Sequence, residues 1–108
     1  MIEGPRVTND KVIDAWTHGL SAQNHNGTFG SISYPNGRAE LFSYELKIGE
    51  RTKAGVCVLA DYTAPAGGFK SMTTSQHVCL AKHTIGKKLV IMNPRVWQCS
   101  PLSEDKPF

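Results

Sequence analysis

The run Val-Cys-Val-Leu-Ala at residues 56–60 constrains the fold most, because all of its side chains are apolar. A strand with one face in water alternates apolar and polar residues, whereas an uninterrupted apolar run is typical of a strand covered on both faces. The run therefore predicts a central strand. It ends at Asp61-Tyr62-Thr63 and opens into a glycine-rich loop.

Other apolar patterns predict the elements that precede this strand. A helix that begins at Asn9 and stops at His18-Gly19, with Gly19 in the left-handed conformation, is expected, because four apolar residues follow Asn9 at helical spacing. They are Val12, Ile13, Trp16 and Leu20. Residues 28–34 and 41–48 read as strands, the second with clear alternation, and Pro35-Asn36-Gly37 supplies a tight turn after the first.

The order of the elements predicts an α+β fold and a single domain over residues 1–108. A second helix is expected over residues 74–85 and a last strand over residues 89–92. We expect a mostly antiparallel sheet of three to five strands packed against two helices. Residues 1–8 would form an N-terminal arm and residues 100–108 a frayed tail.

Composition disfavours several classes of protein. With 40% hydrophobic and 19% charged residues, the chain is globular rather than disordered. No apolar run approaches the roughly 18 residues of a membrane-spanning helix, and the amino terminus lacks the apolar segment of a signal peptide. The three cysteines have neither metal-binding nor disulfide spacing, so reduced thiols in a cytosol are expected.

The glycine-rich loop and the helix start after it form the candidate binding site. Unpaired N–H groups and the helix dipole favour negative charge at such a position, and Thr73 and Gln76 have the spacing of a capping box. The site would hold a phosphate or a carboxylate. Its candidate residues are Gly67, Gly68, Lys70, Ser71, Thr73, Thr74, Ser75 and His77. In the alternative interpretation, the hydroxyls only cap the helix and the glycines only make the turn.

The sequence indicates no catalytic or metal-binding constellation. His77, near the positive end of a helix dipole, should be neutral, but no nucleophile lies at a fixed spacing from it. Cys79 and His83 share a helix face, yet no second pair completes a tetrahedral metal site. We therefore predict no catalytic residue, no metal and no cofactor, and enzymatic activity is disfavoured.

Charge is distributed unevenly along the chain. The net charge is +3, yet residues 62–103 contain Lys and Arg without any Asp or Glu. This asymmetry predicts attraction to a polyanion, such as DNA or RNA, or to an acidic protein surface. The basic patch consists of Lys82, Lys87, Lys88 and Arg95, with Lys70 as a further base of this segment. The alternative is a solvated face of ordinary lysines.

Four motifs follow one another in a recognisable order. They are Trp-Thr-His-Gly at residues 16–19, Leu-Phe-Ser-Tyr at 41–44, Asp-Tyr-Thr at 61–63 and, most specific, Ser-x-Thr-Thr-Ser-x-His at 71–77. Over residues 12–83 the chain resembles a group of small proteins encoded by tailed bacteriophages. The resemblance implies action in the host cytoplasm, on host machinery or nucleic acid, and many such proteins bind and block a host protein such as a defence nuclease. It assigns no functional residue.

We expect a non-enzymatic phage accessory protein that binds and modulates a host protein or a nucleoprotein complex. The basic second half would supply long-range attraction, and the loop before Thr73 would supply specificity. Two alternatives stay open. The domain could bind a phosphorylated ligand or nucleotide at residues 67–77, or it could be a virion or assembly component. No membrane partner is expected.

Overall fold

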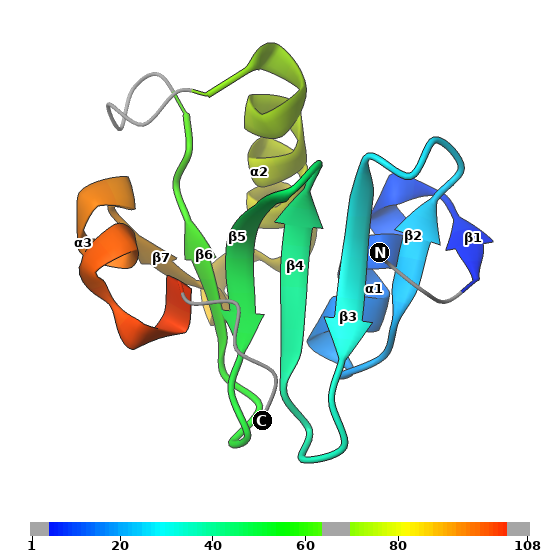
Figure 1. The fold of residues 1–108 in the computed structure, drawn as a ribbon, viewed down its shortest axis with the longest axis horizontal. Coiled ribbons are helices and arrows are strands. Elements are labelled where there is room, and N and C mark those ends of the chain that lie inside the picture. Colours follow the sequence, from blue (N-terminus) through cyan, green and yellow to red (C-terminus); the bar gives the residue numbers. More distant parts are fainter. Residues whose placement is uncertain (1–4, 64–69, 104–108) are drawn as a thin grey trace.

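In the computed structural model, which describes residues 5–63 and 70–103, a seven-stranded sheet runs through the molecule (Figure 1). Its strands lie side by side in chain order: β1 (Arg6–Val7), β2 (Ala22–Asn24), β3 (Phe29–Ser33), β4 (Ala39–Ser43), β5 (Leu46–Arg51), β6 (Cys57–Ala60) and β7 (Val90–Met92). The helices are α1 (Asn9–Thr17), α2 (Met72–Ile85) and α3 (Pro94–Cys99), with short 3-10 helices η1 (Gly86–Lys88) and η2 (Pro101–Ser103). Across the described ranges, no helix has the length and apolar character that crossing a membrane requires.

Each edge of the sheet is formed by a strand–helix–strand unit whose two strands are parallel. α1 joins β1 to the parallel β2, and α2 joins β6 to the parallel β7. The four pairings between β2 and β6 are antiparallel. β1 and β6 have the same orientation, and both crossover connections move to the next strand in the same direction across the sheet. Because such connections are normally right-handed, both helices lie on one face of the sheet. The two helices contact each other there, behind the sheet in Figure 1.

The α+β class is confirmed, but the sheet was predicted wrongly in size and direction. It has seven strands rather than three to five and is mixed rather than mostly antiparallel, and the described residues form three α-helices rather than two. β1 and β2, which were not predicted, are too short for alternation to be recognised in sequence, whereas β7 lies within the strand predicted at residues 89–92. Residues 41–48 form a hairpin instead of one strand. The chain turns at Tyr44, whose φ of 56° is rare outside glycine, so no sequence signal marks the turn.

A β-bulge in β5 decides which charged residues share a face of the sheet. The register between β4 and β5 shifts between Leu41 and Phe42, which leaves Ile48 as an extra residue. Residues three apart in a regular strand point to opposite faces, but the bulge brings Lys47 and Glu50 to the same face. Lys47 Nζ lies 2.8 Å from a carboxylate oxygen of Glu50.

Trp16 fixes α1 to the middle of the sheet. Its indole Nε1 donates a hydrogen bond of 3.2 Å to the carbonyl of Ala39. Its ring lies so close to β5 that a Cβ added to Gly49 would come within 2.7 Å of it. Glycine at this position therefore permits the close approach of helix and strand. Val12 and Ile13, fully buried, complete the predicted apolar face.

At the end of α1, one residue predicted to belong to the apolar face of the helix lies elsewhere. The helix ends at Thr17, and Gly19 follows with a φ of 72°, as the predicted stop requires. Leu20 therefore lies beyond the last turn and is 59% exposed. Its assignment to the apolar face was wrong, because helical spacing applies only while the helix continues.

The segment after β7 covers the opposite face of the sheet. η2 contacts β5, and the buried Trp97 of α3 has its ring centre 5.9 Å from Lys47 Nζ. β6 is buried at all of its positions, as the apolar run predicted. Within the segment predicted to be an N-terminal arm, residues 6 and 7 pair with residues 23 and 24 as β1.

Candidate functional site

The structure shows how the side chains of the predicted site are arranged at the start of α2. Ser71 is the N-cap, and its Oγ accepts a hydrogen bond of 3.1 Å from the backbone N–H of Thr74. The helix begins at Met72, two residues before the predicted start. The capping box of Thr73 and Gln76 was therefore wrong: an equally short hydroxyl earlier in the chain takes the capping position.

Thr74 and His77 point into the core, where they meet Ser43 of the β4–β5 hairpin. The Ser43 hydroxyl lies 2.8 Å from His77 Nδ1 and 2.9 Å from the Thr74 hydroxyl. The His77 ring also stacks on Phe29, with ring centres 4.2 Å apart. Both α2 side chains are only 3% exposed, and Ser43 is fully buried. This polar chain therefore fastens α2 to the sheet.

His77 and Ser43 form a contact of the type that activates a nucleophile, but its surroundings differ. Burial lowers the pKa of His77, so the imidazole is neutral at pH 7. The sequence predicted a neutral ring for another reason, the helix dipole. A nucleophile must reach a reacting atom, and the Ser43 hydroxyl is enclosed by Thr74 and His77. The pair carries no catalytic role in this geometry.

Three of the remaining predicted residues lie within the described part of the chain. Lys70 is exposed, with its Nζ 5.9 Å from the ring centre of Tyr62. Thr73 and Ser75 are half-buried in the first turn of α2. Gly67 and Gly68 lie outside the described residues. An anion site at this helix start stays a prediction.

The basic patch predicted from the sequence is divided among separate places. Lys82 forms an ion pair of 2.8 Å with Asp61, which also accepts a hydrogen bond from Thr63. Arg95 lies in α3, beyond the last residue of β7. Only Lys87 and Lys88 remain adjacent, exposed in η1.

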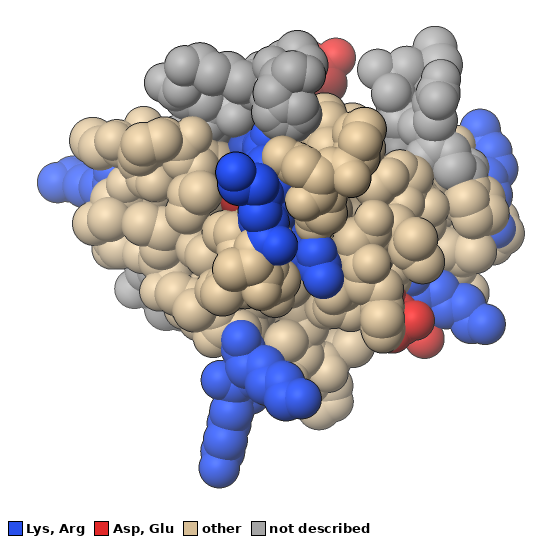
Figure 2. Space-filling model, turned by 90° about the horizontal axis from the view of Figure 1, so that it is seen from below, with Lys and Arg blue, Asp and Glu red and all other residues tan. Residues whose placement is uncertain are grey.

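The strand directions create a different grouping of basic residues. β2, β4, β6 and β7 all begin at the same end of the sheet, so the four connections that precede them gather there. These connections, residues 18–21, 34–38, 52–56 and 86–89, contain no Asp or Glu. Their lysines and arginine are Arg38, Lys53, Lys87 and Lys88. We call the exposed members Lys53, Lys87 and Lys88 the basic end. Figure 2 looks onto it and shows Lys and Arg side chains with little acidic surface between them.

Next to this end, the sheet buries a network of four charged side chains that the sequence did not reveal. The Glu50 carboxylate receives Arg38 Nε at 2.6 Å and Lys47 Nζ at 2.8 Å. Lys47 also lies 2.7 Å from Glu40, whose carboxylate accepts a hydrogen bond from Tyr34. The hydrogen bond to Glu50 raises the pKa of Arg38. Both acids are therefore buried. The alternation of side chains along the strands and the bulge in β5 together place them there.

No metal site is formed by the part of the chain that the structure describes. Groups of three or more His, Cys, Asp or Glu side chains suited to a metal do not occur there. Cys79 and His83, the predicted half-site, are exposed. Of the free cysteines, Cys57 is buried and Cys79 and Cys99 are exposed. With this geometry established, comparison with known proteins adds no assignment: no family model, curated protein or solved structure matches the chain.

Proposed function

We propose that this protein acts by binding, as a non-enzymatic accessory protein, and that its partner is a host nucleoprotein complex whose nucleic acid contacts the basic end. The observation that supports this most is the topology. Lys53 is far from Lys87 and Lys88 in sequence, and the strand directions bring all three to one end, where the four connections contain no acid. The phosphate groups of a nucleic acid are attracted to such an exposed lysine cluster.

The exposed charges of the whole described surface favour the same kind of partner. Acidic side chains are exposed at three described positions, Asp10, Asp14 and Glu45. Basic side chains are exposed at seven: Arg6, Lys11, Lys53, Lys70, Lys87, Lys88 and Arg95. A surface with this excess attracts a polyanion over a distance of about one Debye length, roughly 8 Å at physiological salt. The resemblance to phage proteins adds the expectation of a host partner.

Binding to a labelled 20-base-pair DNA duplex and to a single-stranded RNA, measured by fluorescence anisotropy across a salt series, tests the proposal. The test variant changes Lys53, Lys87 and Lys88 to Glu. It should weaken binding strongly and reduce the salt slope by about three, roughly one for each lost phosphate contact.

A matched control separates local contact from net charge. It changes Lys11, Lys70 and Arg95 to Glu, three exposed bases outside the basic end. This control alters the net charge equally and should retain most of the affinity and the salt slope. If both triple variants lose affinity equally, the basic end has no special role. If neither nucleic acid binds at low salt, the nucleic-acid part of the proposal is wrong.

A further inference from the structure

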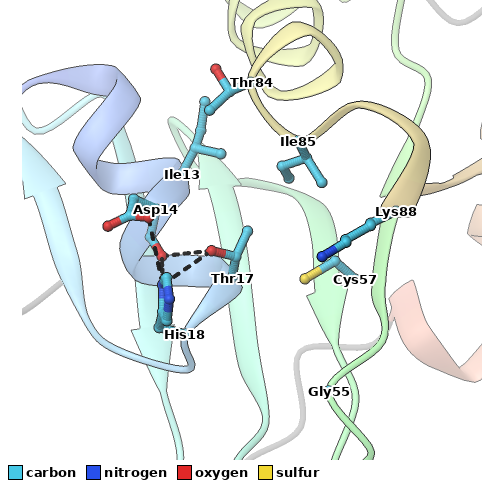
Figure 3. Close-up of a pocket in the computed structure, with 9 residues that line it drawn as sticks. All are labelled: Ile13, Asp14, Thr17, His18, Gly55, Cys57, Thr84, Ile85 and Lys88. Atoms are coloured by element: carbon cyan, nitrogen blue, oxygen red, sulfur yellow. Dashed lines mark hydrogen bonds and ion pairs between the residues drawn. The ribbon is translucent and has the colours of Figure 1, made fainter.

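A pocket of about 350 Å³ opens between α1, the end of α2, η1 and the start of β6 (Figure 3). This volume is at the lower end of the range for small-molecule sites, so it suits a ligand with one ring or a branched chain. The pocket draws on four segments that are far apart in sequence. Its lining residues are Ile13, Asp14, Thr17, His18, Gly55, Cys57, Thr84, Ile85 and Lys88.

One part of the pocket lining is apolar. Ile13 is fully buried, Cys57 is 7% exposed and Ile85 is half-buried. The three side chains come from α1, β6 and the end of α2, and they face the same hollow in Figure 3. Burial raises the pKa of the Cys57 thiol, which therefore stays uncharged and adds to the apolar surface. An apolar ligand body gains free energy by displacing water from the exposed parts of Ile85 and Cys57, whereas Ile13 has no exposed surface.

The α1 wall of the pocket has polar groups that already satisfy one another. The carbonyl oxygen of Asp14 accepts a hydrogen bond of 2.7 Å from the Thr17 hydroxyl and lies 2.8 Å from His18 Nδ1. The Asp14 carboxylate lies 3.5 Å from the same His18 nitrogen. Figure 3 shows this group on one side of the hollow. The Asp14 carboxylate is 73% exposed, so this wall carries a negative charge and the opposite wall must supply any positive charge.

Lys88 carries the charge of that opposite wall. Its side chain extends from η1 toward the hollow, across from His18 (Figure 3). No carboxylate among residues 5–63 and 70–103 forms an ion pair with Lys88. Arg51, whose Nε donates to the carbonyl of Thr17 at 3.0 Å, adds positive potential behind Gly55. The wall opposite Asp14 is therefore positive and has room for an anion.

We propose that this pocket binds a small organic monoanion with an apolar body, such as an aryl or branched-chain carboxylate. The body packs against Ile85 and Cys57, and the carboxylate accepts hydrogen bonds from the Lys88 ammonium. A charge-assisted contact of this kind, beside an apolar floor, discriminates an acid from its neutral amide. The inference shares Lys88 with the basic end, but it concerns a ligand within the pocket and is tested without nucleic acid, so either proposal can fail while the other stands.

The probes are phenylacetate and its neutral analogue phenylacetamide, and their binding is followed by NMR of the backbone amides. Phenylacetate should shift the amide signals of Thr17, Gly55 and Lys88 and bind about three- to tenfold more tightly than phenylacetamide. The variant Lys88→Met should abolish that preference while still binding the ring. Lys11→Met, an exposed lysine of α1 outside the pocket, should keep the preference. Equal affinity for the two probes, or no shifts at about 10 mM, would overturn the proposal.

The cysteines supply a second readout that needs no substitution. Alkylation by N-ethylmaleimide is followed by mass spectrometry at Cys57, with the exposed Cys79 and Cys99 as internal references. Phenylacetate at about nine times its Kd should slow alkylation of Cys57 about tenfold, because only the empty pocket reacts. The two reference cysteines should react at unchanged rates. Binding that leaves the Cys57 rate unchanged would place the ligand elsewhere and contradict the proposal.

Discussion

The polar side chains at the start of α2 point into the core, whereas those of the basic end point into solvent. At the start of α2, Ser43, Thr74 and His77 turn inward and satisfy each other in the core. At the basic end, lysines from two connections turn outward, and no acid lies among those connections. The first region has chemistry-bearing residues that serve stability, and the second has ordinary residues placed where a partner can reach them. The comparison teaches that the direction of a side chain matters more than its chemical type.

The largest expected effect concerns the charges that point inward beside the basic end. Glu50→Gln removes one anion from the network, so Arg38 and Lys47 lose a charged acceptor in a buried place. We expect a loss of about 3–5 kcal/mol in the free energy of unfolding, measured by urea denaturation. Glu45→Gln, at the exposed hairpin turn, should change it by about 0.5 kcal/mol or less. A small loss for Glu50→Gln would mean that water reaches the network, and the contrast between inward and outward charges would fail.

An intermediate effect tests the inward-facing start of α2. Ser43→Ala leaves the Thr74 hydroxyl and His77 Nδ1 without their shared partner. We expect a loss of about 1–3 kcal/mol in the free energy of unfolding, with unchanged binding to the DNA duplex. Ser75→Ala, at a half-buried position in the same helix, is the control and should cost less. If Ser43→Ala weakened DNA binding without lowering the free energy of unfolding, the start of α2 rather than the basic end would be the functional site.

The smallest expected effect is the pH dependence contributed by His77. Because burial lowers its pKa in the folded state, the unfolded chain takes up its proton first as the pH falls below about 6.5. Stability should therefore fall on acidification by at most about 1.4 kcal/mol per pH unit from this group. His77→Gln should flatten the profile between pH 7 and pH 5, whereas His83→Gln, at an exposed position, should leave its slope unchanged. A profile with equal slopes in all three proteins would show that His77 does not titrate on unfolding.

Much of the fold could be predicted from local patterns. The helical spacing of Val12, Ile13 and Trp16 placed the buried face of α1, and the apolar run at residues 56–60 placed β6. The hairpin within residues 41–48 could not be predicted, because Tyr44 adopts its turn conformation without glycine or asparagine. The longer elements carry their own signal, whereas the short edge strands exist only through their neighbours.

The candidate sites were less predictable than the fold. Ser71, Thr74 and His77 were identified as a group, yet the inward direction of Thr74 and His77 depends on Ser43, more than thirty residues away in sequence. The pocket draws residues from α1, α2, η1 and β6, so no single motif marks it. The buried acids Glu40 and Glu50 could not be told from surface acids, because the bulge that turns Lys47 and Glu50 to one face is a property of strand pairing.

The sequence alone determined the class of fold, the identity of the main core residues and the absence of acids from residues 62–103, because each is local in the chain. Only the tertiary structure decided which charges are buried and which lysines stand together. The reason is physical: a side chain meets water or the core according to strand direction and register, and both are set by pairing between distant segments.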